Sequence, residues 1–154
     1  MLTPWYITGF CEGEAAFTYS RYGKSFNLYF AIKSNAEDRN LIEQVRDFFG
    51  VGHIYEVRPR LPKAYSRYTR AAVYYRTTKI SHLDTIVRHF DKYPLVGKKQ
   101  ASYQIWKKMF LLKRNFRRPD FARLQELASA LSDLTSKNTT TKRKLHNGEN
   151  NRNL

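Results

Sequence analysis

The sequence predicts an α+β domain in which helices cover one face of a four-stranded antiparallel sheet. Two pairs of segments, within residues 16–33 and 53–78, alternate apolar and polar side chains as half-buried strands do. A segment with helical periodicity precedes each pair, and more helical segments follow the second. Hydrophobic residues are 42% and aromatic residues 15% of the 154-residue chain, enough for one packed core. The uncovered face of the sheet is expected to be rich in Arg, Lys, Asn and Tyr.

The first helix is expected from Pro4 to about Glu14, with Thr3 as its N-cap. Gly9 and Gly13 are four residues apart and share one helix face, so they form a flat strip that a second backbone can approach closely. Glu12 and Glu14 lie at the C-terminal end of this helix. A carboxylate is unfavourable at that end of the helix dipole, so a cationic group is expected nearby. Without further context, a solvated helix end is the commoner explanation.

The first hairpin runs from Ala16 to Tyr22 and from Ser25 to Lys33, around a turn at Gly23. Ser34 and Glu37 form a capping-box pattern that opens the second helix, which Gly50 closes as its C′ residue. The apolar stripe of this helix consists of Leu41, Ile42, Val45, Phe48 and Phe49.

The second hairpin comprises strands from His53 to Arg58 and from Arg70 to Thr78, joined by a basic loop. Three helices are expected after it: one capped by Ser81, one from about Lys98 to Arg114, and one that Pro119 starts. Beyond Ser136 the chain is polar and basic, with almost nothing to bury. We therefore expect one domain over residues 1–135 and a flexible basic tail over residues 136–154.

The charge of the chain indicates a polyanionic partner. The formal net charge is +15 and the isoelectric point is near 10.1. Nucleic acid is the leading candidate, because a charge this large otherwise destabilises the compact state by self-repulsion. The single Cys11 excludes an internal disulfide and a multi-cysteine zinc site, and the histidines lack metal-ligand spacing. The absence of a signal-peptide pattern and of an apolar run of roughly 18 residues predicts an intracellular protein without a membrane span.

The first helix resembles the LAGLIDADG motif of homing endonucleases, in its GFxEGE variant, over Ile7-Thr8-Gly9-Phe10-Cys11-Glu12-Gly13-Glu14. The resemblance covers roughly residues 5–134 and implies an αββαββα fold with a saddle-shaped sheet that straddles DNA. The chain has one such motif, and the family needs two motif helices packed together. The resemblance therefore implies a homodimer on a long near-palindromic site, with Gly9, Phe10 and Gly13 at the dimer interface.

The activity that the resemblance implies is metal-dependent hydrolysis of phosphodiester bonds in double-stranded DNA. Glu14 would be the metal-binding acid of each subunit, with the Gly13 carbonyl beside it, and Glu12 would be structural. The cofactor would be Mg²⁺, and Mn²⁺ or Ca²⁺ would fit the same oxygen ligands. For the family's active-site lysine the sequence offers Lys98 and Lys99, of which the spacing to Tyr103 favours Lys99. Ser34 stands where the family often has a glutamine in the solvent network around the metal, and Ala15-Ala16 replaces the usual Gly-Ser.

DNA contacts are expected from the open face of the sheet. The alternation of side chains nominates Thr18, Ser20, Tyr22, Ser25, Asn27, Tyr29, Lys33, His53, Tyr55, Arg70, Tyr74 and Arg76. Lys142 and the other cations of the tail would contact phosphates.

Two other functions use the same scaffold. One is an RNA-binding intron maturase and the other is a DNA-binding protein without catalysis. Glu14, Gly13 and the downstream lysine pair favour the enzyme over the second of these, but nothing in the sequence separates the enzyme from the maturase. Members of the family occur in organelles (mitochondrion or chloroplast) and in microbial cytoplasm, so the sequence does not indicate the compartment.

Overall fold

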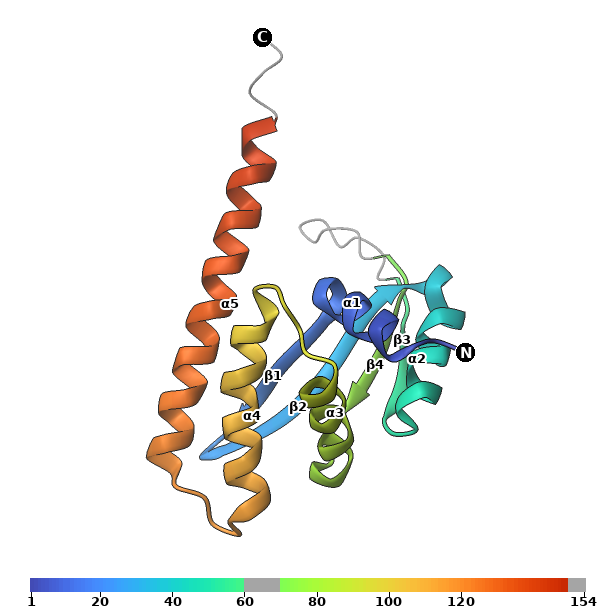
Figure 1. The fold of residues 1–154 in the computed structure, drawn as a ribbon. Coiled ribbons are helices and arrows are strands. Elements are labelled where there is room, and N and C mark those ends of the chain that lie inside the picture. Colours follow the sequence, from blue (N-terminus) through green and yellow to red (C-terminus); the bar gives the residue numbers. More distant parts are fainter. Residues whose placement is uncertain (60–69, 150–154) are drawn as a thin grey trace. The chain divides into compact units, whose positions relative to one another are not determined.

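A computed structural model describes residues 1–59 and 70–149 of the chain, with side chains of the last helix described up to residue 136. The chain divides into two compact units, Met1–Gln100 and Ala101–Leu154. The first unit contains α1 (Pro4–Glu14), β1 (Ala15–Tyr22), β2 (Ser25–Asn35), the short 3₁₀ helix η1 (Ala36–Asp38), α2 (Arg39–Phe49), β3 (His53–Val57), β4 (Ala72–Thr77) and α3 (Ile80–Lys92). The helix α4 (Lys99–Asn115) begins at the end of this unit, and α5 (Phe121–Glu149) follows it (Figure 1).

The four strands form one antiparallel sheet in the order β1-β2-β4-β3 (Figure 1). This confirms the expected α+β class and the pairing of the two hairpins into a single sheet. Helices α1, α2 and α3 contact the strands, and alternate side chains of β1, β2 and β4 are buried. The sheet therefore has one covered face and one open face, as the alternation predicts.

The core of the first unit centres on Phe30 of β2, which is fully buried. Its ring centroid lies 5.2 Å from that of Phe17 in β1 and 5.9 Å from those of Phe49 in α2 and Phe90 in α3. These distances are typical of aromatic pairs that stabilise a core beyond the burial of their area. One side chain thus joins two strands to two of the covering helices.

Three expected helix starts are wrong. Ser34 does not cap α2, because β2 continues through Asn35 in its ladder with β4 and the helix starts only at Arg39, after η1. Helix α3 begins at Ile80, so Ser81 lies inside its first turn. Helix α5 begins after Asp120, whose Oδ1 accepts a hydrogen bond of 3.0 Å from the Ala122 N–H, and Pro119 precedes this cap. At α2 the ladder with β4 uses the backbone that the expected cap would serve, and at α5 Asp120 serves as the cap.

The second hairpin is shorter than expected. β3 ends at Val57 and β4 starts at Ala72, so Arg58 and Arg70 lie outside the sheet. Both arginines are exposed.

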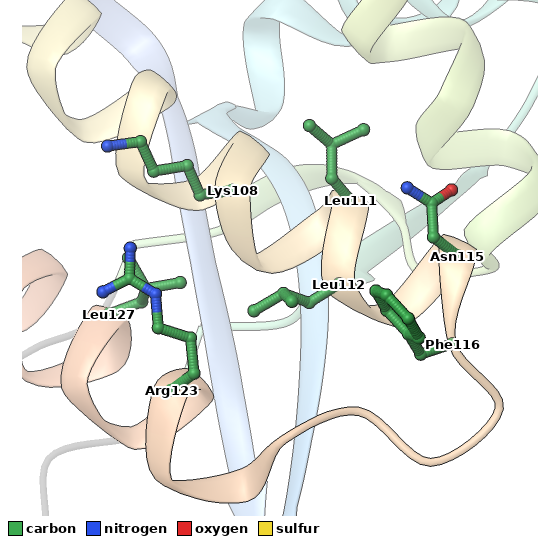
Figure 2. Close-up of a pocket in the computed structure, with 7 residues that line it drawn as sticks. All are labelled: Lys108, Leu111, Leu112, Asn115, Phe116, Arg123 and Leu127. Atoms are coloured by element: carbon green, nitrogen blue, oxygen red, sulfur yellow. The ribbon is translucent and has the colours of Figure 1, made fainter.

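The second unit contains α4 from Ala101 onward and α5. The buried residues of α5 include Leu124, Leu127, Ala128 and Leu131, at the spacing of one helix face. A hollow of about 230 Å³ lies in this unit and is lined by Lys108, Leu111, Leu112, Asn115, Phe116, Arg123 and Leu127 (Figure 2). No carboxylate lines it, so it offers no ligands of the kind that Mg²⁺ prefers.

The helix α5 continues to Glu149, which contradicts a flexible tail from residue 136. The segment from 136 to 149 contains no proline and includes several good helix formers, so it extends the helix without an apolar stripe of its own. The division into a domain of residues 1–135 and a tail stays a prediction. No helix among the described residues is long and apolar enough to cross a membrane.

A buried polar cluster ties α1 to the end of α3. The Thr8 hydroxyl donates a hydrogen bond of 2.9 Å to the Tyr93 carbonyl and lies 3.1 Å from Nε2 of His89. Because that hydroxyl has one proton, His89 must donate its Nε2–H to Thr8. His89 is 8% exposed and its ring packs against those of Phe48, Phe49, Phe90 and Tyr93.

Acid should therefore destabilise the fold through His89. Burial lowers the pKa of His89 from 6.5 to about 4, so between these pH values the unfolded chain binds a proton that the folded chain does not. The free energy of unfolding should fall as the pH drops from 6.5 to 4, by about 3 kcal/mol from this residue. Urea unfolding across this range measures the loss. His89→Gln keeps a donor for Thr8 but cannot titrate, so it should lose less stability than the wild type; equal losses would contradict the assignment.

Candidate active site

Helix α1 presents two different faces. The side chain of Thr3 accepts a hydrogen bond of 3.2 Å from the Tyr6 N–H, which confirms the expected N-cap. Ile7, Thr8 and Cys11 are buried, whereas Gly9 and Gly13 are exposed. A Cβ at either glycine would meet no atom within 4 Å. The flat strip therefore lies on the surface of the chain, with open space in front of it.

Aromatic side chains border this strip. Phe10 stacks on Tyr6 with ring centroids 6.3 Å apart, and Tyr6 is 46% exposed. Trp5, one residue earlier, is 59% exposed. The open face of α1 thus combines side-chain-free positions with exposed rings, a composition suited to contact with another apolar surface. The assignment of Gly9, Phe10 and Gly13 to a dimer interface stays a prediction.

The two glutamates of α1 have different surroundings. Oε1 of Glu12 accepts hydrogen bonds from the backbone N–H groups of Val96 (2.5 Å) and Gly97 (2.9 Å). A Cβ on Gly97 would lie 2.8 Å from Oε2 of Glu12, so a glycine lets the loop approach this closely. Glu14, by contrast, is exposed at the last position of the helix. This difference supports the expected structural role of Glu12.

Lys99 lies beside the C-terminal end of α1. Its Nζ donates a hydrogen bond to the carbonyl oxygen of Ala15, the residue that follows Glu14. Lys99 is half-buried, whereas Lys98 is exposed in the preceding turn. The cationic group expected near the C-terminal end of the helix dipole is therefore present. The geometry favours Lys99 over Lys98 as the lysine of the candidate site.

Cys11 of α1 and Ser34 of β2 do not present free reactive groups. Burial raises the pKa of the Cys11 thiol to about 12, so Cys11 stays protonated and acts as a small apolar side chain. Ser34 donates a hydrogen bond of 2.6 Å from its hydroxyl to Oδ2 of Asp38. The role of Ser34 in catalysis stays a prediction, and its hydroxyl proton already has an acceptor within the chain.

The described residues contain no group of three or more His, Cys, Asp or Glu side chains that could hold a metal. The oxygens at the end of α1 are the Glu14 carboxylate and the carbonyl of the neighbouring Gly13. Both are hard oxygen donors, the type that Mg²⁺ and Ca²⁺ bind. A single copy of this chain offers too few of them to complete a coordination shell.

The register of the sheet places the expected DNA-contacting residues on one face. Across the strands, Thr18 pairs with Tyr29 and Ser20 with Asn27, and Tyr74 pairs with both Lys33 and Tyr55. The open face consists of Ala16, Thr18, Ser20, Tyr22, Ser25, Asn27, Tyr29, Ala31, Lys33, Asn35, His53, Tyr55, Val57, Ala72, Tyr74 and Arg76. Arg70 is the exception among the nominated residues that the structure describes, because it precedes β4, and the side chain of Lys142 lies outside the described part of the chain.

Asn35 shares this face and was missed from the sequence. The alternation of side chains would have identified it, but the expected capping box assigned that position to a helix start. Ala16, Ala31 and Ala72 also lie on this face, where small side chains leave room for their larger neighbours.

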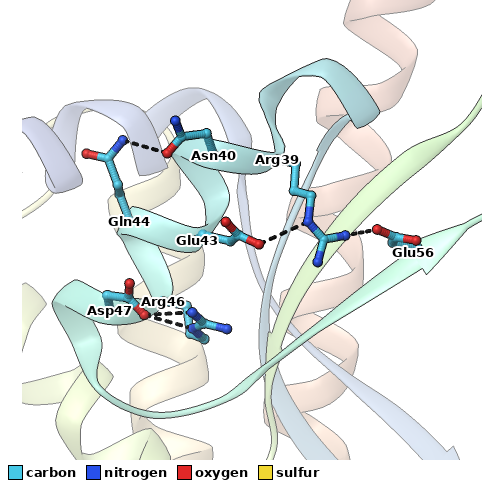
Figure 3. Close-up of polar contacts among 7 residues, drawn as sticks. All are labelled: Arg39, Asn40, Glu43, Gln44, Arg46, Asp47 and Glu56. Carbon is cyan, nitrogen blue, oxygen red and sulfur yellow. Dashed lines mark hydrogen bonds and ion pairs between the residues drawn. The ribbon is translucent and has the colours of Figure 1, made fainter.

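The open face carries no carboxylate. None of its residues is Asp or Glu, whereas the neighbouring helix α2 mixes both signs. Figure 3 shows Arg39 of α2 bonded to both Glu43 and Glu56. Glu56 belongs to β3 but alternates with the open-face residues Tyr55 and Val57, so it points to the other side. The charge separation gives this face a positive potential that suits a polyanion.

Cations on the open face lie over aromatic rings. The guanidinium carbon of Arg76 is 3.9 Å from the centroid of Tyr29, and Nζ of Lys33 is 5.4 Å from that of Tyr74. Tyr55 also contacts His53, with ring centroids 6.4 Å apart. These contacts restrict where the positive groups point.

Comparison with known proteins identifies relatives of this chain. Residues 7–110 match the family model described as LAGLIDADG endonuclease. The chain is 30% identical over 123 residues to an uncharacterised 50.9 kDa protein in ND4 intron 1 of Podospora anserina, covering 74% of this chain and 25% of that protein. It is 31% identical over 121 residues to probable intron-encoded endonuclease 3 of Neurospora crassa, covering 74% of this chain and 21% of that one. The chain therefore spans about a quarter of the length of these curated relatives.

Solved structures agree in fold. The meganuclease I-AabMI bound to uncleaved DNA matches with a TM-score of 0.71 and 28% identity, over 84% of this chain and 45% of that one. I-CpaMI bound to uncleaved DNA matches with a TM-score of 0.67 and 27% identity, over 82% and 42%. The homing endonuclease I-TnaI has a TM-score of 0.69 at 21% identity, over 88% of this chain and 95% of that one, and shows the shared fold.

Removing the Glu12 carboxylate should loosen the loop that precedes Lys99. We expect Glu12→Ala to lower the free energy of unfolding by about 1 to 2 kcal/mol, because two backbone donors lose a charged acceptor. Urea unfolding measures the loss, and hydrogen exchange should show faster exchange at the Val96 and Gly97 amides. Glu43→Ala removes a partly exposed carboxylate of α2 and should cost less than about 0.5 kcal/mol. Unchanged exchange at both amides in Glu12→Ala would show that the carboxylate does not hold the loop.

Proposed function

Because this chain belongs to the LAGLIDADG endonuclease family, we propose that it is a site-specific endonuclease that cuts double-stranded DNA as a homodimer on a long near-palindromic site. The observation that carries the proposal is the junction of α1 and β1. Glu14 ends the helix, Ala15 begins the strand without a connecting loop, and Lys99 bonds to Ala15. The exposed carboxylate therefore adjoins the open face of the sheet, so a duplex bound on that face would pass close to it.

The open face suits a DNA groove. Its Arg, Lys, Asn and Tyr side chains can hydrogen-bond to base edges, and Arg76 and Asn27 are the types that pair best with guanine and adenine. The face carries no acid, so it does not repel phosphates. The exposed Arg70 and the cations of α5, Lys142 among them, are suited to phosphate contacts, which carry affinity but little sequence information. The affinity for DNA should therefore fall steeply as salt rises.

A second motif helix would complete the site. Gly9 and Gly13 face open space on a helix whose other face is buried, so the strip is available to another copy of α1. The DNA-bound meganucleases I-AabMI and I-CpaMI match this chain over 45% and 42% of their length, which leaves room in each for a second domain of similar size. In the proposed homodimer, two copies of this chain take those two places.

The pairing would bring two Glu14 carboxylates together. Like charges that close do not both stay ionised without a compensating cation. Hard oxygen ligands from Glu14 and Gly13 fit a divalent ion, of which Mg²⁺ is the one we propose, with Mn²⁺ or Ca²⁺ as substitutes. When bound, such an ion supplies charge stabilisation to the attacking and leaving oxygens of phosphodiester hydrolysis. Lys99 adds a fixed positive charge at the same end of the helix and can stabilise negative charge that develops on the phosphate.

Replacement of the proposed catalytic acid separates cleavage from binding. Glu14→Gln should bind a selected duplex as well as the wild type or better, because a negative charge near phosphates is removed. Its cleavage rate in Mg²⁺ should fall at least about a hundredfold, since a metal ligand is lost. Glu43→Gln, which neutralises a carboxylate of α2, should cleave normally. Gel-based cleavage and fluorescence anisotropy provide the two measurements, and full cleavage by Glu14→Gln would exclude Glu14 as the acid. Tight binding of structured RNA by a wild type that cleaves no duplex would instead favour the maturase.

A bulky residue in the glycine strip should abolish the dimer without unfolding the monomer. Gly9→Leu places its side chain in open space within one copy, and leucine favours a helix over glycine by roughly 0.8 kcal/mol. In a dimer it would separate the two helices. Analytical ultracentrifugation should show a wild-type dimer and a Gly9→Leu monomer with the wild-type circular dichroism spectrum. Gly9→Ala keeps a small side chain and should remain dimeric. A monomeric wild type, or a dimeric Gly9→Leu, would contradict the interface.

A further inference from the structure

Arg76 and Tyr29 are in closer contact than a cation and a ring that merely share a surface. The guanidinium carbon of Arg76 lies 3.9 Å from the ring centroid of Tyr29, which is close to van der Waals contact. Both residues are half-buried, although they lie on the open face of the sheet. The ring therefore covers one side of the guanidinium.

The register of the strands explains how the two side chains meet. Arg76 of β4 lies directly opposite Ala31 of β2, and Tyr29 precedes Ala31 by two residues on the same face. Ala31 has only a methyl group, so the long side chain of Arg76 can pass over it and reach Tyr29, the diagonal neighbour on β2. Diagonal neighbours in an antiparallel sheet lie about 7–8 Å apart, within reach of arginine and tyrosine.

Within the described residues, Arg76 is placed by the Tyr29 ring and not by a hydrogen bond to its Nε. Its Nε is buried and has no hydrogen-bond partner among the described residues. A buried donor without a partner costs free energy, whereas a donor exposed to solvent would bond to water and avoid that cost. The contact with the Tyr29 ring is therefore what orients the plane of the guanidinium, since no described carboxylate or carbonyl binds its Nε.

We propose that Tyr29 and Arg76 act as one base-reading unit, in which Arg76 recognises a guanine in the major groove and Tyr29 is a positioning residue that contacts no base edge. Arginine recognises guanine by donating two parallel hydrogen bonds to O6 and N7, which requires the guanidinium plane to match the plane of the base. A ring stacked on the guanidinium fixes that plane before DNA binds, so less side-chain entropy is lost on binding. This inference rests on the proposed function, because it requires sequence-specific binding of duplex DNA.

The test compares base preferences at every position of the target. The full-length protein and its variants select bound duplexes from a randomised DNA library, and sequencing gives the preference at each position. Arg76→Lys keeps the charge but loses the planar fork. It should lose a guanine preference of about tenfold or more at one position in each half-site and leave other positions unchanged.

The variants of Tyr29 distinguish positioning from direct contact. Tyr29→Leu should weaken the preference for the same guanine by about two- to fivefold, because the stack is lost. Tyr29→Phe keeps the ring and should retain the wild-type preference at every position. Tyr74→Leu is the matched control, because it removes the ring beneath Lys33 on the same face. It should leave the Arg76 position unchanged.

The inference is overturned if Tyr29→Phe alters a position that Arg76→Lys does not, since the hydroxyl would then read a base of its own. It is also overturned if Tyr29→Leu leaves the guanine preference intact. A wild type that selects no sequence would overturn the proposed function as well as this inference. The variants lie on the open face, and wild-type thermal unfolding would exclude misfolding as the cause of a change.

Discussion

The contact between Glu12 and the loop before α4 is the constraint on which the candidate site depends. Val96 and Gly97 follow Glu12 by more than eighty residues, yet both of their N–H groups bond to one of its carboxylate oxygens. The loop leads directly into Lys99, whose ammonium bonds to the carbonyl of Ala15. Two polar contacts therefore hold the end of α1 against the start of α4. This arrangement explains a carboxylate at the unfavourable end of a helix dipole, because its charge is balanced by backbone donors.

Helix α1 serves the core, the surface and the site with different faces. Ile7 and Cys11 are fully buried, and Thr8 bonds to His89 and to the Tyr93 carbonyl at the end of α3. Gly9 and Gly13 lie on the exposed side, so the fold of one copy does not need them to be small. A glycine in the middle of a helix costs roughly 0.8–1 kcal/mol relative to alanine. Two such glycines with no close neighbour in the chain are best explained by a partner that needs the space, which is the reason a second motif helix enters the proposal.

Much of the fold could be predicted because it depends on local patterns. Alternation identified the strands and assigned Thr18, Asn27 and Tyr74 to the face on which the structure places them. The caps could not be predicted in the same way. Ser34 and Glu37 fit a capping box, but the pairing of Ser34 with Val73 extends the strand, and the partner strand lies almost forty residues away. The helix from 136 to 149 was missed for the opposite reason, because its composition lacks the apolar stripe by which helices are recognised.

The candidate site shows the same division between local and distant information. The motif nominated Glu14 and Gly13, and the spacing to Tyr103 favoured Lys99 over Lys98. The carbonyl that Lys99 contacts and the amides that bind Glu12 depend on the tertiary fold. The separation of charge on the sheet depends on both local and distant information. Its sign follows from the sequence, since residues 17–33 contain no acid. Its sharpness follows from the pairing of strands, which puts Glu56 and Arg39 on the helix side and Arg76 and Lys33 on the other.

Small side chains on the open face determine where its cations can point. Ala16, Ala31 and Arg76 form one row across β1, β2 and β4, with His53 of β3 at its end. A larger residue than Ala31 would block the path of Arg76 towards Tyr29 and direct the guanidinium away from the sheet, where it would sample many orientations. An arginine that samples many orientations binds phosphates well but distinguishes bases poorly. In the proposed arrangement Ala31 therefore matters although it offers no side-chain hydrogen bond, because its small size leaves Arg76 room to lie against Tyr29.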